Sequence, residues 1–138
     1  MDTVPTRRAE IRALAASTLE HCRYHPRQGI DADTGATSLT QALILAAGGT
    51  VHAPRGRVRE PREPGARADL HGVARDLLAE LGVEAPAGSC PCRALARWEA
   101  GADAASAYRL IGARPAASRY LRVAVPATPA VPARRRAA

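Results

Sequence analysis

Apolar residues recur at steps of three and four along three segments of this chain, and that spacing limits the folds open to it. The segments are roughly residues 6–24, 38–47 and 69–81. Steps of three and four place side chains on one face of an α-helix, whereas a half-buried strand alternates every second residue. We therefore predict an all-α fold, a small orthogonal or bundle-like array of four to five helices. At most, a minor hairpin is expected near residues 29–35 and 50–58.

Turn and capping residues mark the ends of these three helices. Pro26 ends the first, because proline cannot continue a helix. Ser38, followed three residues later by Gln41, has the form of a capping box at the start of the second. That second helix is apolar all round, which predicts that it is the most buried. Gly82 suits a left-handed cap at the end of the third.

Two shorter helices are expected after residue 88. Ser89 is a candidate cap for a helix that carries Leu95 and Trp98. Asp103 is expected to cap the last helix, which carries Tyr108. Helices this short do not persist alone, so they must dock onto the rest of the domain.

Large apolar side chains are scarce in this sequence. Leu, Ile and Val number 24 in 138 residues, Ala numbers 32, and Phe is absent. This composition favours a compact core with disordered flanks. Residues 53–66, with three Pro and two Gly, are expected to form an exposed linker within a helical domain spanning 1–114. Residues 115–138, rich in Pro, Ala and Arg, are expected to be a disordered basic tail.

Positive charge is concentrated outside the predicted helices. All 20 basic residues are Arg, and the absence of Lys, Asn and Phe is simply explained by a GC-rich genome. Of the net charge of +7, residues 115–138 carry +5 and residues 53–68 carry +3, leaving −1 for the remainder. We expect weak, salt-dependent and non-specific nucleic-acid binding, with Arg134, Arg135 and Arg136 as phosphate contacts.

The three cysteines do not form an even disulfide framework, and no apolar run is long enough to span a membrane. A reducing, cytoplasmic location is therefore expected. His21 and His25 are four residues apart on a predicted helix, and with Cys90 and Cys92 they are the candidate metal ligands. A one-residue Cys spacer is atypical of zinc knuckles, and Cys22 falls on an apolar stripe. We expect no cofactor and no stoichiometric metal.

Other chemistry finds less support in the sequence. Asp31 and Asp33 suggest a calcium loop, but Ala42 stands where an EF-hand needs its bidentate Glu. No nucleophile elbow or phosphate-binding glycine loop is present. The run Ser89-Cys90-Pro91-Cys92 offers a candidate thiolate at a helix start, with His71 as the one base to consider.

Over residues 8–113 the order of elements is similar to that of an uncharacterised family of small actinobacterial helical proteins, a domain of unknown function. The resemblance rests on the Asp-x-Asp-x-Gly turn, the Leu-rich second helix and the run Leu-Ala-Arg-Trp-Glu at 95–99. In that family Asn-Asp follows the Trp, and a Val-Cys pair precedes the second helix. This chain has Glu99 and Ser38 at those places. The resemblance implies a helical fold and supplies no activity.

By elimination, the sequence favours a small non-catalytic protein–protein interaction or accessory module with an unknown protein partner. The alternatives are an Arg-dependent nucleic-acid-associated protein and a metal- or thiol-dependent enzyme. Trp98 and Tyr108 have two interpretations that the sequence leaves open: a core latch holding the last helices, or an aromatic anchor in an interface.

Overall fold

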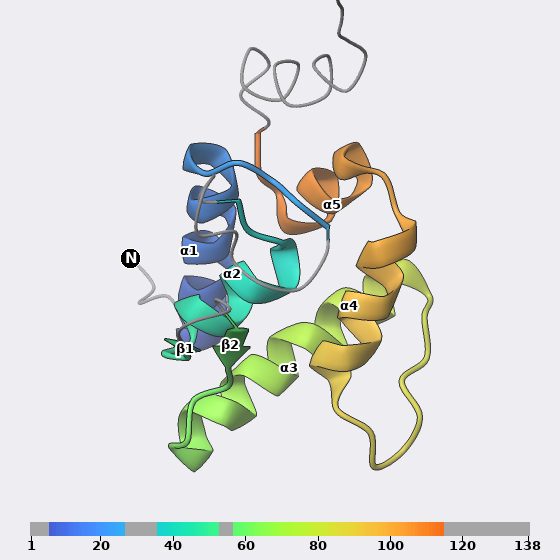
Figure 1. Cartoon of the computed structure of the whole chain (residues 1–138). Helices are drawn as coiled ribbons and strands as arrows, with labels where there is room; N and C mark the ends of the chain where they lie inside the picture. Colours follow the sequence, from blue (N-terminus) through green and yellow to red (C-terminus); the bar gives the residue numbers. More distant parts are fainter. Residues whose placement is uncertain (1–5, 27–35, 53–56, 115–138) are drawn as a thin grey trace, which may run out of the picture.

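The computed structural model describes residues 6–26, 36–52 and 57–114. These residues form five helices and a two-stranded hairpin (Figure 1). The elements are, in chain order, α1 (Arg7–His21), α2 (Leu39–Ala46), β1 (Thr50–His52), β2 (Arg57–Arg59), α3 (Pro64–Leu81), α4 (Pro91–Gly101) and α5 (Ala104–Ile111). The predicted all-α class with a minor hairpin is confirmed. None of the described helices is both long and apolar enough to cross a bilayer.

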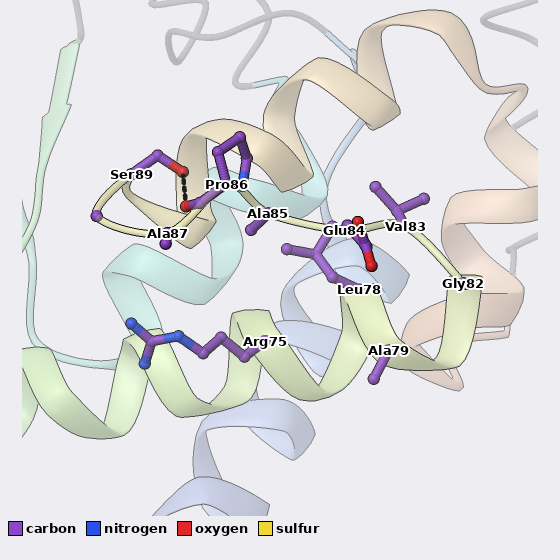
Figure 2. Close-up of a pocket in the computed structure, with 11 residues that line it drawn as sticks. Arg75, Leu78, Ala79, Gly82, Val83, Glu84, Ala85, Pro86, Ala87 and Ser89 are labelled. Carbon is purple, nitrogen blue, oxygen red and sulfur yellow. Dashed lines mark hydrogen bonds between the residues drawn. The ribbon is translucent and has the colours of Figure 1, made fainter.

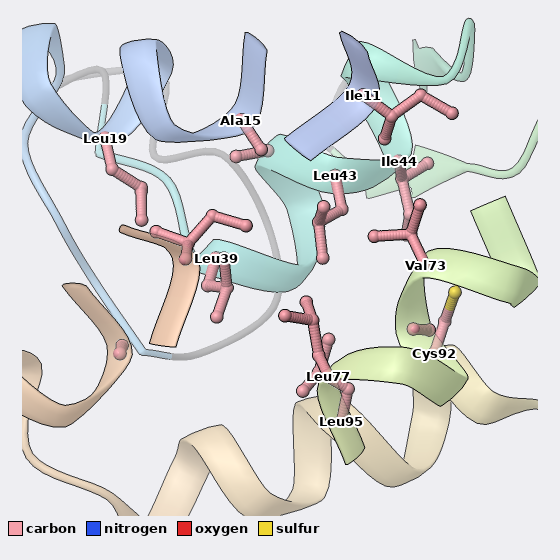
Figure 3. Close-up of a cluster of buried hydrophobic side chains, with 14 of the residues drawn as sticks. Ile11, Ala15, Leu19, Leu39, Leu43, Ile44, Val73, Leu77, Cys92 and Leu95 are labelled. Carbon is pink, nitrogen blue, oxygen red and sulfur yellow. The ribbon is translucent and has the colours of Figure 1, made fainter. Parts of the chain in front are cut away.

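Helix α2 lies between α1 and α4 and contacts both of them (Figure 1). Helix α3 packs against α1 and α4, and α5 contacts the first three helices. Their buried faces meet in one hydrophobic cluster (Figure 3), which includes Ile11, Leu19, Leu39, Leu43, Leu70, Leu77 and Leu95. Every residue of α2 from Leu39 to Ile44 is buried, including the polar Thr40 and Gln41, so the helix is as buried as predicted.

The hairpin and the start of α3 occupy the segment predicted to be an exposed linker. Strands β1 and β2 are antiparallel, with Thr50 opposite Arg59. Helix α3 begins at Pro64, five residues before the predicted start. Proline suits the first helical position, and the Glu63 carboxylate caps the helix by accepting hydrogen bonds from Gly65 N and Ala66 N. Residues 57–59 and 64–66 therefore belong to a strand and a helix rather than to a linker, and residues 53–56 lie outside the described part.

Gly49 allows β2 to lie against the end of α2. A Cβ at this position would collide with the backbone carbonyls of Ile44 and Arg59. Gly48, in the left-handed region at φ +102°, makes the turn that leads there. Because this close approach fixes the end of β2, it also fixes the position of Glu60, the first residue after the strand.

Most of the predicted caps are present. Ser38 and Asp103 each accept a backbone hydrogen bond at the start of α2 and α5, as predicted. Thr6, for which no cap is predicted, does the same at the start of α1. Gly82 is left-handed at the end of α3. The fourth helix differs from prediction: its N-cap is Cys90, because the Ser89 hydroxyl donates to the Pro86 carbonyl instead.

Three expectations concern segments outside the described residues. They are the turn at 29–35, the tail at 115–138, and the phosphate contacts within it at Arg134, Arg135 and Arg136.

Candidate metal centre

Four side chains from different parts of the fold converge on one point. They are Glu60 after β2, His71 on α3, and Cys90 and Cys92 at the start of α4. One ligand atom from each lies within 4.8 Å of the others. Among the described residues this is the one group of three or more His, Cys, Asp or Glu side chains placed to share a metal ion.

Glu60 bridges the other members of the group. Its Oε1 accepts a hydrogen bond from His71 Nε2 at 2.7 Å, and its Oε2 accepts one from the Cys90 thiol at 3.1 Å. Arg67 Nε lies 3.8 Å from Oε1. Burial by itself would raise the pKa of Glu60, but the hydrogen bonds from Cys90 and His71 and the charges of His71 and Arg67 outweigh it, so the pKa lies below its ordinary value.

The first turn of α4 presents both thiols to the group. Pro91 occupies the first helical position, so Cys90 is the N-cap and Cys92 the second residue of the helix. The partial positive charge of a helix N-terminus favours thiolates at these places. Cys92 is also buried against the core (Figure 3), and this burial, together with the negative charge of Glu60, raises the pKa of its thiol. A cation would be needed to hold Cys92 as a thiolate.

Three separations between His71, Cys90 and the Glu60 oxygens lie close to those of a tetrahedral metal site. Zinc bonds of about 2.0–2.3 Å separate tetrahedral ligand atoms by about 3.3–3.8 Å. The separations here are 2.7 Å from His71 Nε2 to Glu60 Oε1, 3.1 Å from Cys90 Sγ to Glu60 Oε2 and 3.9 Å from Cys90 Sγ to His71 Nε2. Shifts of well under 1 Å between these atoms would bring the three measured separations into the zinc range. The protons now shared within the group would leave as the metal binds.

The same residues do not form a nucleophilic triad. In a triad the carboxylate and the nucleophile contact opposite nitrogens of the histidine ring. Here Glu60 and Cys90 both approach Nε2 of His71, and the carboxylate is the nearer, at 2.7 Å against 3.9 Å. The Cys90 thiol donates to the carboxylate rather than to the ring. This geometry does not activate Cys90 through His71.

Glu60, His71 and Cys90 face an open cleft of about 840 Å³, and buried Cys92 does not line it. A second cavity, of about 570 Å³, lies between the C-terminal half of α3 and the loop that follows it (Figure 2). Its titratable lining side chains are Arg75 and Glu84. Because the converging His, Cys and Glu side chains lie at the first cleft, we place the candidate site there.

The structure separates the metal ligands suggested by the sequence. Cys90 and Cys92 belong to the cluster, whereas His21 and His25 do not. His21 ends α1, where its Nδ1 lies 2.8 Å from the Ser17 carbonyl oxygen, and His25 is exposed beyond that helix. The helical spacing of these two histidines therefore does not create a site with the cysteines.

Trp98 is half-buried against the core, and Tyr108 is buried with its hydroxyl donating to the Leu19 carbonyl at 3.0 Å. The Tyr108 ring also meets Tyr24 edge to face, with centroids 5.5 Å apart. Tyr108 is thus placed for packing, and Trp98 alone of the two retains a partly exposed surface.

Sequence reasoning missed Glu60, and it considered His71 only as a catalytic base. Glu60 lies 11 residues before His71 and 30 before Cys90, so no short motif contains the set. The Cys-Pro-Cys run was the available signal, since a Pro at the first helical position places both flanking thiols at a helix start.

Comparison with protein-family models, with curated proteins and with solved structures finds no match for this chain. The assignment of a function therefore depends on the geometry of the cluster.

Proposed function

We propose that this protein is a zinc-binding, non-catalytic module in which Glu60, His71, Cys90 and Cys92 hold the ion. The observation that carries the proposal is the convergence of the four ligand atoms within 4.8 Å. Two thiolates, an imidazole and a carboxylate are all donors that zinc accepts in a tetrahedral site. Magnesium and calcium prefer all-oxygen sites, so the thiols favour zinc. This proposal departs from the sequence-based expectation of no stoichiometric metal.

Four protein ligands fill the tetrahedron and leave no position for water or substrate, which is the pattern of a structural zinc site. The ion would join the end of the hairpin to the start of α4 and to α3, which already packs against α4 in the core. Metal binding would then contribute directly to folding. A structural zinc site supports the non-catalytic accessory module that the sequence favours. We propose that this module acts by binding a protein partner.

A cytoplasmic location forms part of the proposal, because ligating cysteines must stay reduced. All three cysteines are free thiols in the structure.

The second candidate function is an Arg-dependent nucleic-acid-associated protein. The observation that favours it is the positive charge of residues 53–68 and 115–138.

Cobalt(II) titration of the purified, reduced chain tests the site, because cobalt can replace zinc. Bound cobalt gives visible bands that depend on the coordination geometry, and thiolate ligands add charge-transfer bands. We expect saturation at about one equivalent, with intense bands typical of tetrahedral thiolate ligation. His71→Ala and Cys90→Ser should lose this spectrum. The matched variants His25→Ala and Cys22→Ser should keep it, since neither residue belongs to the cluster.

Far-ultraviolet circular dichroism of each variant separates loss of ligation from loss of folding. Glu60→Gln provides a milder change, because it keeps the size of the side chain while removing its charge. It should weaken cobalt binding and shift the visible bands. Identical spectra for His71→Ala and His25→Ala, or no bands in the wild type, would contradict the proposal.

A further inference from the structure

Four arginine side chains line the cleft beside the metal centre. They are Arg59 at the end of β2, Arg62 just after it, Arg67 in the first turns of α3, and Arg93 on α4. Among the described residues that line the cleft, Glu60 is the single carboxylate. The cleft is therefore strongly positive, although the helical part of the chain as a whole is close to neutral.

Most of this charge is not neutralised by ion pairs with the residues that the structure describes. Arg67 is paired with Glu60 and donates from Nε to the Pro61 carbonyl at 3.2 Å. Within residues 6–26, 36–52 and 57–114, no ion pair is found for Arg59, Arg62 or Arg93. Each of the three arginines of α1, by contrast, pairs with a carboxylate. Like charges gathered around one cavity repel one another, and a bound anion would relieve that repulsion.

We propose that this cleft binds a phosphate group of a ligand through Arg59, Arg62 and Arg93. Guanidinium groups present paired N–H donors that match phosphate oxygens, and a phosphate dianion suits several arginines at once. Thr50, which also lines the cleft, adds a hydroxyl donor. The volume of about 840 Å³ exceeds what one phosphate ion fills and leaves room for the remainder of a larger ligand.

Phosphate binding at the arginines is separate from zinc binding at the cluster. Glu60 contacts His71, Cys90 and Arg67, and among the described residues it forms no ion pair with Arg59, Arg62 or Arg93. The proposal goes beyond the zinc site and does not require it. Zinc binding is followed by the cobalt spectrum and phosphate binding by titration of the folded chain, with circular dichroism checking the fold of the zinc-free form. Failure of one proposal is thereby distinguished from failure of the other.

Isothermal titration of the full chain at fixed ionic strength tests the cleft with three probes: inorganic phosphate, adenosine monophosphate and a thymidine decanucleotide. The variant Arg59→Gln/Arg93→Gln removes two cleft charges. The control Arg97→Gln/Arg109→Gln removes two exposed charges that do not line the cleft, one of them a helical turn beyond Arg93. We expect saturable binding that falls about tenfold or more in the cleft variant and stays within about twofold in the control.

Saturable binding of adenosine monophosphate or inorganic phosphate, weakened in the cleft variant but not in the control, supports the proposal. It indicates that the ligand is a small phosphorylated molecule. The same pattern with the decanucleotide alone supports it and makes a nucleic-acid backbone the source of the phosphate. Equal losses in the two double variants would show that only net charge matters and would overturn the proposal. Absence of saturable binding for all three probes would overturn it as well.

Discussion

At the scale of single residues, Glu99 is the most tightly bound polar group in the core. Its carboxylate is fully buried and accepts hydrogen bonds from the Tyr24 hydroxyl, Leu39 N, Thr40 N and the Thr40 hydroxyl, at 2.6–3.1 Å. Burial raises the pKa of Glu99, and these four donors oppose the rise. Because Leu39 and Thr40 begin α2, Glu99 attaches α4 to the positive end of that helix.

Glu99→Gln should lower the free energy of unfolding by about 1–3 kcal/mol. In this variant an amide NH₂ group replaces one carboxylate oxygen and faces groups that are themselves hydrogen-bond donors. Buried N–H groups are then left without an acceptor. Urea denaturation of this variant beside Glu84→Gln measures the effect, since Glu84 is exposed. Equal stability of the two variants would show that the buried carboxylate does not hold α4 to α2.

At the scale of elements, α4 and α5 are short helices that depend on docking. Trp98 packs at the edge of the core from α4, and Tyr108 reaches from α5 to the Leu19 carbonyl on α1. Because Tyr108 is buried, the latch interpretation of this pair has more structural support than an exposed aromatic anchor. The interface interpretation rests on the exposed part of Trp98 alone.

Trp98→Ala should therefore destabilise the domain by about 2 kcal/mol, less than the ~3–5 kcal/mol typical of a fully buried Trp. Thermal unfolding, with Arg97→Ala as the exposed neighbour on the same helix, measures this difference. Full stability of Trp98→Ala would defeat the latch interpretation. If recovery of a protein partner were lost at full stability, the interface interpretation would replace it.

Helical spacing and capping chemistry predict α2 and α5 closely, because those signals lie within each element. The first helix is expected over residues 6–24 but ends at His21, and Tyr24 instead forms a bridge with Thr37. The start of α3 is missed since a Pro next to Gly is typical of a loop, yet Pro64 also suits the first position of a helix. The same ambiguity applies to β2: Val58 is the single large apolar residue in its neighbourhood, too little for a strand signal.

The site is harder to predict than the elements for a physical reason. Cys90 and Cys92 are visible as a pair, but Glu60 and His71 join them only because Gly49 lets the hairpin pack against α2 and because α3 lies beside α4. These are tertiary contacts without a local sequence signature. His21 and His25 have the helical spacing of a metal pair, yet the described fold keeps them apart from the cluster.

At the scale of the whole molecule, the cluster connects the hairpin, α3 and α4, so a bound ion would act on the entire fold. The measurement that tests this most directly is the zinc content of the chain purified from zinc-supplemented cells, by elemental analysis after gel filtration. We expect about one zinc per chain in the wild type and in His21→Ala, and almost none in Cys92→Ala. Zinc well below stoichiometry in the wild type, or equal zinc in Cys92→Ala and the wild type, would contradict it.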